Sequence, residues 1–303
     1  MSRFTRAAAG LLVGLALLGT ASCAEPQAVG ADRTSARKAA FDRSLHDRLP
    51  QAVRDRGVLR VGTDASYAPM SSFAADGRTI VGVEPDLGTE LGRVLGVRVE
   101  FVDTDFTEVI PDVAAGRLDL GMSAITDTRD RARHADFVNY FSAGTSILVQ
   151  QGNPAGVTDI RDLCGNVVAV ERGTTQVDLL ARAQRNCADE RVARRITVRT
   201  YPTNSDALVE LRTGRAVAVL NDLPPAAFLV NDPLTKPHYQ LASDTQYEPG
   251  LYGIAVAKDR LDLRDAVQGA CEALIRSGAY ADVLARWGVK DGAVARISVN
   301  SER

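Results

Sequence analysis

The sequence predicts an α/β fold of two similar lobes, and two observations support that prediction. First, short runs of β-type residues alternate with segments whose apolar residues recur every three to four positions. Second, one pattern occurs twice, about a hundred residues apart: a helix end, a Gly-Arg pair, a strand and a polar tip, at 115–123 and 213–222. Ligands of such folds bind beyond the carboxyl ends of the strands, where Ser123 and Asp222 would project.

The first 22 residues are predicted to be an export signal. Two arginines precede an apolar run at 7–18, which is too short to span a bilayer and has the proportions of a secretory signal. Small residues then end at Cys23, which resembles a bacterial lipobox, in which the cysteine is lipidated and becomes the mature N-terminus. An ordinary signal peptide cut nearby is the alternative.

The remaining elements follow in order along the chain. Residues 23–56 are expected to hold the lipid anchor, a linker without apolar periodicity, and a short helix in which apolar residues recur every four positions from Phe41 to Leu49. The folded body then begins with a strand at 58–62. It continues with a helix over 87–95 capped by Gly96, a strand at 97–102, a helix at 106–113 ended by Gly116, and a strand at 118–120.

The cysteines become interpretable once the chain is taken to be exported. Cys164 and Cys187 flank a predicted strand and helix, and a disulfide is the natural pairing in an oxidising compartment, although sequence alone leaves the pairing open. Cys271 lies on an apolar helical stripe and is expected to be a core residue. No metal-ligand spacing, nucleophile–base pair or phosphate loop is present in the sequence, so we expect neither a metal nor a cofactor.

Six short motifs then occur in a fixed order, at 62–69, 121–129, 172–176, 219–222, 252–256 and 278–288. Together they resemble family 3 of the bacterial solute-binding proteins, the amino-acid receptors of ABC importers, over roughly residues 57–290. The resemblance implies a type II periplasmic-binding-protein-like fold, with two mixed sheets flanked by helices and joined by a two-strand hinge. Lobe 1 would take 57–145 and 246–290, lobe 2 would take 146–245, and 291–303 would be a C-terminal tail.

A free amino acid carries a carboxylate and an ammonium group on neighbouring atoms, so its site needs a fixed cation and a fixed anion. Arg129, in the second motif, is expected to grip the carboxylate, because a guanidinium offers two parallel hydrogen bonds. Thr175 would add donors at a helix start, and Asp222 would bind the ammonium group. Composition alone also allows a solvated helix start at Arg129, a plain N-terminal cap at Thr175 and a turn cap at Asp222.

The other end of the pocket is expected to be acidic. The resemblance places Tyr67 against the ligand side chain and Asp64 near its polar end, unless they are a core tyrosine and a turn aspartate. Glu171 stands just before the third motif, where specificity is often set in the family. Together with Glu84, these acids favour a polar or cationic amino acid, unless Glu84 and Glu171 point to solvent.

Two positions depart from the family pattern. Ala124 stands where relatives commonly place a hydroxyl residue that binds the carboxylate. Val83 stands where many relatives carry an aromatic residue opposite Tyr67. The sequence therefore predicts a site that lacks one hydroxyl contact and one aromatic wall.

The resemblance implies an extracytoplasmic lipoprotein on the outer face of the cell membrane that captures a free amino acid by hinge closure. Its partners would be the membrane permease and ATPase subunits of an ABC importer. We expect a monomer that performs no chemistry, and a net charge of −2 gives no general field for nucleic acid. Two alternatives stay open: a cyclohexadienyl dehydratase-like enzyme on the same fold, and a sensor that presents its ligand to a membrane receptor.

Overall fold

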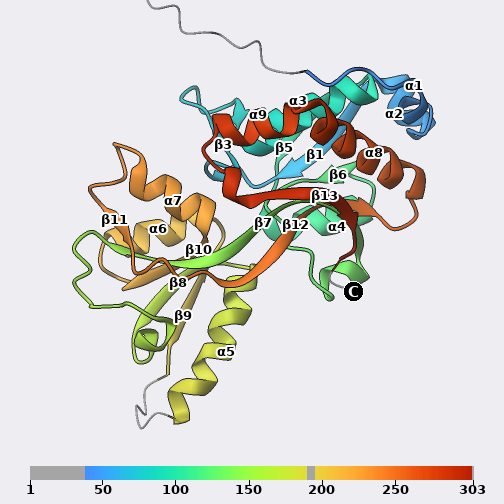
Figure 1. The fold of residues 1–303 in the computed structure, drawn as a ribbon. Helices are drawn as coiled ribbons and strands as arrows, with labels where there is room; N and C mark the ends of the chain where they lie inside the picture. The colour runs from blue at the N-terminus through green and yellow to red at the C-terminus, as the bar shows by residue number, and fades with distance from the viewer. Residues whose placement is uncertain (1–37, 190–194, 302–303) are drawn as a thin grey trace, which may run out of the picture. The chain divides into compact units, whose positions relative to one another are not determined.

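The computed structural model describes residues 38–189 and 195–301. The predicted signal peptide, Cys23 and the linker up to residue 37 lie outside them. Two long strands, β7 (Ala135–Gln150) and β12 (Tyr247–Ala257), run antiparallel and connect two lobes, as Figure 1 shows. Among the described helices, none is both long and apolar enough to cross a bilayer.

Lobe 1 is built on parallel strands that lie beside β12, in the order β5-β1-β6-β12. The predicted strands and helices of this region are confirmed, including the left-handed glycine that ends the first long helix, Gly96 with φ 65°. A small antiparallel sheet follows the first strand. The elements are β1 (Val58–Thr63), β2 (Ser66–Tyr67), β3 (Ser71–Phe73), β4 (Ile80–Val81), α3 (Val83–Leu95), β5 (Arg98–Asp103), α4 (Phe106–Ala114), β6 (Leu120–Gly121), η1 (Arg131–Arg133), α8 (Leu261–Ser277), α9 (Ala279–Arg286) and η3 (Lys290–Gly292).

Lobe 2 continues from the other half of β7, in the order β7-β10-β8-β9. The pairs β10–β8 and β8–β9 are parallel, whereas β10 runs antiparallel to β7. Cys164 and Cys187 form the predicted disulfide, which ties the start of this lobe to its longest helix. The elements are η2 (Ile160–Leu163), β8 (Val167–Glu171), α5 (Thr175–Asp189), β9 (Thr197–Tyr201), α6 (Asn204–Arg212), β10 (Ala218–Asp222), α7 (Leu223–Asn231) and β11 (Tyr239–Leu241).

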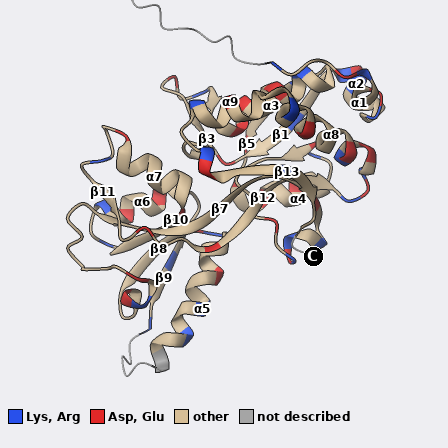
Figure 2. Cartoon of the chain, viewed as in Figure 1, with Lys and Arg blue, Asp and Glu red and all other residues tan. Residues whose placement is uncertain are grey.

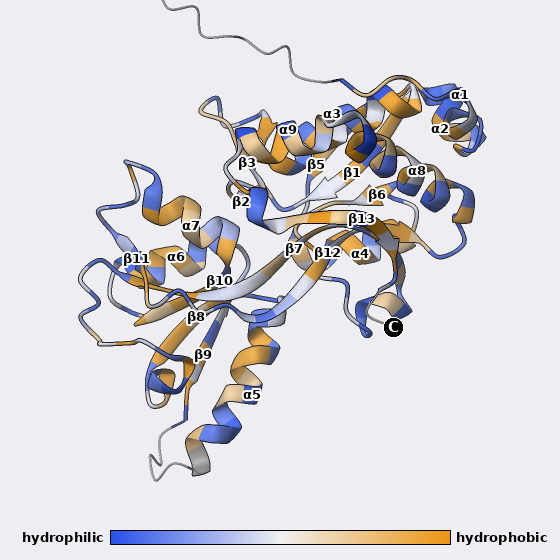
Figure 3. Cartoon of the chain, in the orientation of Figure 1, coloured by the Kyte–Doolittle hydropathy of each residue, from blue (hydrophilic) through white to orange (hydrophobic). Residues whose placement is uncertain are grey.

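The predicted α/β class and two-strand hinge are confirmed, with one refinement to the sheets. Because β7 and β12 are long enough to pass from one lobe to the other, the sheets of the two lobes join into a single ten-stranded mixed ladder. Hydrophobic residues gather on strands such as β8 and β13 (Ala293–Val299), while connecting loops are hydrophilic (Figure 3). Acidic and basic residues are interspersed over the helices and loops of both lobes in the view of Figure 2.

Two segments near the ends of the described chain differ from expectation. The helix expected across 41–49 is only the short α1 (Arg43–His46), and a second helix, α2 (Gln51–Arg56), starts directly after Pro50. Proline has no N–H to donate, so it ends the first helix and suits the start of the second. The expected C-terminal tail is a strand, β13 (Ala293–Val299), which pairs with β7 and buries Ile297.

Candidate functional site

The side chains singled out from the sequence meet between the lobes. Asp64 and Ser123 follow the ends of strands β1 and β6 of lobe 1 by one and two residues. Strands β8 and β10 of lobe 2 end at Glu171 and Asp222, so the carboxyl ends of strands from both lobes face one place. These four residues line one pocket. Its remaining walls are Tyr67, Phe106, Ala124, Thr126, Arg131, Thr174, Thr175 and Gln176.

The lobe 1 wall is held in shape by hydrogen bonds between neighbouring loops. The Asp64 N–H donates to the Ser123 hydroxyl at 2.9 Å, and the Asp64 carboxylate accepts from the Ser66 N–H at 2.8 Å. Asp64 is buried, and this burial raises the pKa of its carboxyl group. Both predicted residues, Asp64 and Ser123, therefore lie in the pocket, and Ser123 also fixes the loop that presents Asp64.

Arg131, rather than the predicted Arg129, lies at the pocket. After Thr126 the chain turns, with the Ala132 N–H donating to the Thr128 carbonyl, and this turn leaves Arg129 exposed. The Arg131 guanidinium turns inward and donates to the Thr126 carbonyl and to the Gly173 carbonyl of lobe 2, each at 2.9 Å. Its central carbon lies 5.2 Å from the centre of the Phe106 ring, within cation–π range.

The surroundings of Arg131 leave its charge available to a ligand. Burial lowers its pKa to about 10, against the attraction of Asp222, so the group remains a cation at neutral pH. Its two acceptors are backbone carbonyls, which carry no net charge. A guanidinium has five N–H donors, so it retains donors for a carboxylate. Among the residues that line the pocket, Arg131 is the only lysine or arginine, and it stands two positions after the predicted Arg129.

Asp222 is buried and held from three sides. Its carboxylate accepts hydrogen bonds from the Gln176 amide at 2.6 Å, the Tyr252 hydroxyl at 2.5 Å and the Thr145 hydroxyl at 3.4 Å. Its own N–H donates to the Tyr67 hydroxyl across the lobes at 3.0 Å. Burial raises the pKa of Asp222, and the Tyr252 hydrogen bond and Arg131 oppose that rise. Asp222 stands at the N-cap position of α7, but its side chain makes no capping hydrogen bond there, so the alternative of a turn cap does not describe its carboxylate.

Glu171 is a buried acid of the pocket whose pKa is strongly raised. It is only 6% exposed, and no described residue forms a hydrogen bond to its Oε1 atom. Burial and the nearby Asp64 carboxyl group raise the pKa of Glu171 to about 9. At neutral pH, Glu171 therefore holds a proton in this arrangement. The alternative in which Glu171 points to solvent does not fit its burial.

Glu84 neither faces the pocket nor points to solvent. It is fully buried in lobe 1, where its carboxylate accepts from the Ser71 hydroxyl at 2.7 Å, the Ala124 N–H at 2.6 Å and the Tyr140 hydroxyl. Ala124 has φ 47°, an uncommon conformation for a residue with a side chain, and the Glu84 bond holds it there. Glu84 thus shapes the pocket wall through Ala124 without touching the pocket.

The aromatic wall predicted to be missing is supplied from another position. Val83 is fully buried in the core, whereas Phe106, the first residue of α4, lines the pocket with Tyr67. Thr175, the first residue of α5, lines the pocket at a helix start, as predicted.

The two lobes touch each other across the pocket. Besides the Tyr67–Asp222 and Arg131–Gly173 hydrogen bonds, the Asn204 N–H donates to the Ser66 hydroxyl at 3.2 Å. The free volume left in the pocket is about 20 Å³. That is room for about one water molecule. We call this arrangement, in which the lobes touch and leave almost no free space between them, the closed form.

Sequence reasoning missed Phe106, Arg131, Gln176 and Tyr252 as site residues. Phe106 could have been predicted from the sequence, because it follows the end of a predicted strand just as Asp64 and Ser123 do. Tyr252 and Gln176 stand in quoted motifs, yet nothing in one sequence shows that both bind Asp222. Within the described ranges, no cluster of three or more His, Cys, Asp or Glu side chains is arranged to hold a metal ion.

Comparisons with known proteins agree with this architecture. The family model for bacterial extracellular solute-binding proteins, family 3, matches residues 59–290. The arginine-binding protein of Corynebacterium glutamicum is 30% identical over 255 residues, covering 84% of this chain and 82% of that protein. A solved ancestral arginine-binding protein bound to glutamine has a TM-score of 0.69 at 30% identity, covering 77% of this chain and 99% of its own.

A further solved structure, an ancestral amino-acid-binding protein described as a precursor of cyclohexadienyl dehydratase, has a TM-score of 0.69 at 31% identity. It covers 78% of this chain and 98% of its own. The family match spans both lobes and every residue of the pocket described above. This chain therefore belongs to family 3 of the bacterial extracellular solute-binding proteins.

Proposed function

We propose that this protein captures a free amino acid with a cationic side chain, such as arginine, between its two lobes. The observation that supports this most is the charge pattern of the closed pocket: one guanidinium, Arg131, stands among three buried carboxyl groups, Asp64, Glu171 and Asp222. An amino acid with a cationic side chain presents one anionic and two cationic groups, so its charges complement this pattern.

The carboxylate and the ammonium group of the ligand each have a complementary residue in the pocket. Arg131 takes the carboxylate, with help from the N–H groups at the start of α5 near Thr175. Asp222 takes the ammonium group, since its carboxylate faces the same pocket from lobe 2. Tyr67 and Phe106 flank the aliphatic part of the side chain. Arg129, which is exposed, receives no role in this arrangement.

The far end of the side chain would lie between Asp64 and Glu171. A guanidinium or ammonium group there would replace the proton that Glu171 otherwise holds, because a nearby cation favours the ionised form of a carboxyl group. A neutral side chain would leave Glu171 protonated and its Oε1 atom without a charged partner. The pocket therefore discriminates by charge as well as by size.

Closure follows from the division of these groups between the lobes. Asp64 and Arg131 belong to lobe 1, whereas Glu171 and Asp222 belong to lobe 2, so only the closed form satisfies every charge of the ligand. A ligand that binds the closed form better shifts the population toward it. Binding at the lobe interface thus drives hinge closure about β7 and β12.

The cellular role follows from the family. Its members are extracytoplasmic binding proteins, and the related proteins bind amino acids. For this chain we propose delivery of the captured amino acid to the permease and ATPase subunits of an ABC importer. We further propose that a lipid on Cys23 anchors a monomer to the outer face of the cell membrane, and that the protein performs no chemistry.

One observation favours a second candidate function. A buried carboxylic acid that stays protonated at neutral pH, as Glu171 does, is what a general acid requires. A solved relative is a precursor of cyclohexadienyl dehydratase. Consumption of prephenate or arogenate by the purified protein would establish this function in place of transport.

The proposed function is tested by thermal unfolding of the purified protein with each of the common amino acids, ornithine and citrulline. A ligand at a hundred times its dissociation constant stabilises a protein by about 2.7 kcal/mol, which shifts the melting temperature measurably. We expect arginine, lysine or ornithine to give the largest shift, and Arg131→Met to abolish it. If no amino acid shifts the transition, the proposal is wrong.

A further inference from the structure

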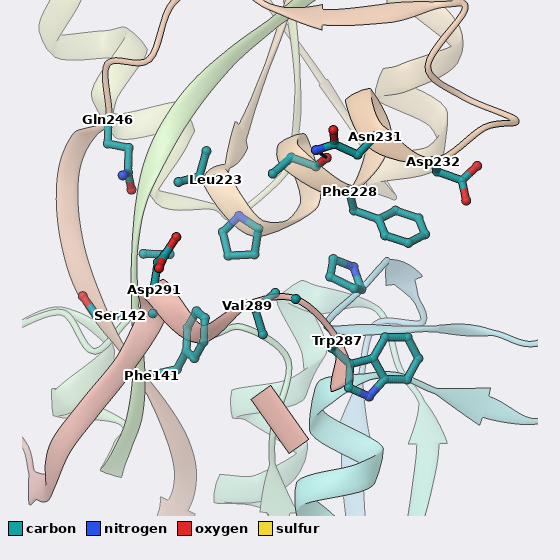
Figure 4. Close-up of a pocket in the computed structure, with 16 residues that line it drawn as sticks. Phe141, Ser142, Leu223, Phe228, Asn231, Asp232, Gln246, Trp287, Val289 and Asp291 are labelled. Atoms are coloured by element: carbon teal, nitrogen blue, oxygen red, sulfur yellow. Dashed lines mark hydrogen bonds between the residues drawn. The ribbon is translucent and has the colours of Figure 1, made fainter. Parts of the chain in front are cut away.

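A second cavity lies beside the hinge, outside the amino-acid pocket. Its volume is about 450 Å³, within the range of small-molecule sites. Lobe 2 contributes helix α7, lobe 1 contributes the turn after α9 at 287–292, and the hinge strand β7 forms the wall between them (Figure 4). None of the residues that line it lines the amino-acid pocket.

The cavity sits at a gap along one edge of β7. Strand β10 pairs with β7 as far as the Asp222–Thr145 position, and β13 begins at the Ala293–Phe141 position. Between these positions, no described strand covers that edge at Ser142 and Ala143, which line the cavity. A molecule in the cavity would therefore touch the part of the hinge that lies between the lobes.

The walls of the cavity are mainly apolar and aromatic. Phe228 of lobe 2 and Trp287 of lobe 1 lie on opposite sides of it, with Phe141 of the hinge and Val289 nearby (Figure 4). The Trp287 indole N–H donates to the Asp86 carboxylate at 2.8 Å, which holds the ring in place. Such walls favour a ligand with a flat apolar body.

The charge of the lining has one sign. Asp232 and Asp291 line the cavity, and its lining includes no lysine or arginine. The faces of tryptophan and phenylalanine also attract cations. The complement of this lining is a small molecule with an aromatic body and one positive charge.

We propose that this cavity is a second binding site, for a small aryl-alkyl ammonium ion. Because such a ligand contacts Phe228 and Trp287 at once, it binds best when the lobes have the present arrangement. It therefore favours the closed form. By linkage, the bound ammonium ion raises the affinity of the amino-acid site by the same factor by which a bound amino acid raises the affinity of the second site. This coupling rests on the proposed function, whereas the site itself does not.

The site can be tested directly, because Trp287 is the only tryptophan of the chain. Phenethylammonium is titrated into the purified protein while tryptophan emission is recorded, with the uncharged 2-phenylethanol as the matched probe. We expect a saturable change in emission, and phenethylammonium binding at least about tenfold more tightly than 2-phenylethanol. A change that does not saturate, or equal affinity for the two probes, would overturn the proposal.

Variants identify the groups responsible. We expect the double variant Asp232→Asn/Asp291→Asn to lose the preference for the charged probe, and Phe228→Ala to weaken both probes by about tenfold. Asp259→Asn is the matched control, since its side chain is 83% exposed and lies outside the cavity lining. If the double variant keeps the full charge preference, the assignment of the site is wrong.

Two further titrations separate this site from the amino-acid pocket. Phenethylammonium should still bind in the presence of saturating arginine and in the Arg131→Met variant. Displacement by arginine would mean that the probe occupies the acidic amino-acid pocket, and the second site would be refuted.

The coupling between the two sites is tested by titrating arginine with phenethylammonium already bound. The affinity for arginine should then rise by about threefold or more. Unchanged affinity would refute the coupling while leaving the amino-acid site intact.

Discussion

At the scale of single residues, the proposed recognition of the ligand depends most on Arg131. It is a half-buried cation whose hydrogen-bond acceptors are uncharged carbonyl groups, one in each lobe. Arg129, two positions earlier, is exposed to solvent. The two residues therefore form a matched pair in the same turn: Arg131 lines the pocket, whereas Arg129 faces solvent.

Substitution of each arginine by methionine should have very different effects. A hydrogen bond to a charged group contributes about 1.5–3 kcal/mol, so loss of the pair from Arg131 to a ligand carboxylate should weaken arginine binding by about 100-fold or more. Arg129→Met should change the affinity by less than about threefold. Calorimetric titration of both variants measures this, with thermal unfolding as a check on folding. The opposite ranking would return the role to Arg129.

Glu171 should make the stability of the unliganded protein depend on pH. Its pKa is raised from an ordinary 4.5 to about 9 by burial and by Asp64. Between those values the folded protein binds a proton that the unfolded chain does not, so stability falls as pH rises, by up to about 1.4 kcal/mol per pH unit. Glu171→Gln should flatten this slope in thermal unfolding between pH 5 and 9. Equal slopes in both proteins would show that Glu171 is ionised in the closed form.

The sequence was enough to predict which kinds of residue form the site, but not every residue that lines it. One cation and several acids at strand ends were expected, and the structure places Asp64, Ser123, Glu171, Thr175 and Asp222 in one pocket. The choice between Arg129 and Arg131 was not predictable, because a one-residue change in the path of a turn reverses which side chain faces inward. Glu84 was misplaced because burial with three donors cannot be recognised in a single sequence.

At the scale of elements, the most dependable predictions were those with clear periodicity and a defined end. Helix α3 has an apolar stripe and ends at a left-handed glycine, and the structure confirms both. Helix α1 was predicted but is shorter than expected, whereas the strand β13 was not predicted, and both differences have a common reason. Their pairing partners, α3 for α1 and β7 for β13, are distant in sequence, so tertiary contacts decide their structure.

Gly173, between two elements of lobe 2, is a position at which an added side chain would hinder the proposed closure of the lobes. It lies between β8 and α5 at φ 78°, and a Cβ atom there would lie 2.7 Å from the Thr107 methyl group of the other lobe. Its carbonyl also accepts the interlobe hydrogen bond from Arg131. A side chain at this position therefore obstructs the closed form directly.

Gly173→Ala should weaken amino-acid binding by about tenfold or more, because contacts below normal distance force the neighbouring atoms to shift. Gly116→Ala is the matched control: its φ is 72°, and no atom lies within 4 Å of the added Cβ. Both variants should lose about 1 kcal/mol of stability from backbone strain, yet only the first should lose affinity. Calorimetry and thermal unfolding measure the two effects separately. Equal affinities in the two variants would argue against closure at Gly173.

At the scale of the whole molecule, the distribution of charge is consistent with the proposed closure of the lobes on a cationic ligand. Asp64 of lobe 1 faces Glu171 of lobe 2, and the closed form tolerates this pair only while Glu171 holds a proton. A cationic ligand side chain between Asp64 and Glu171 would attract both carboxylates and so favour their ionised forms. The pocket has room for about one water molecule in this structure, so the proposed capture would begin from a more open form.

The most direct test of this account compares arginine with citrulline, which has nearly the same shape but an uncharged side chain. Calorimetric titration of the purified protein at neutral pH should show arginine binding about 100-fold more tightly or better, since one charge is paired with buried carboxyl groups. Arginine binding should also release a proton from Glu171, seen as a dependence of the measured heat on the buffer. Equal affinities, without proton release, would contradict the proposed cationic amino-acid site.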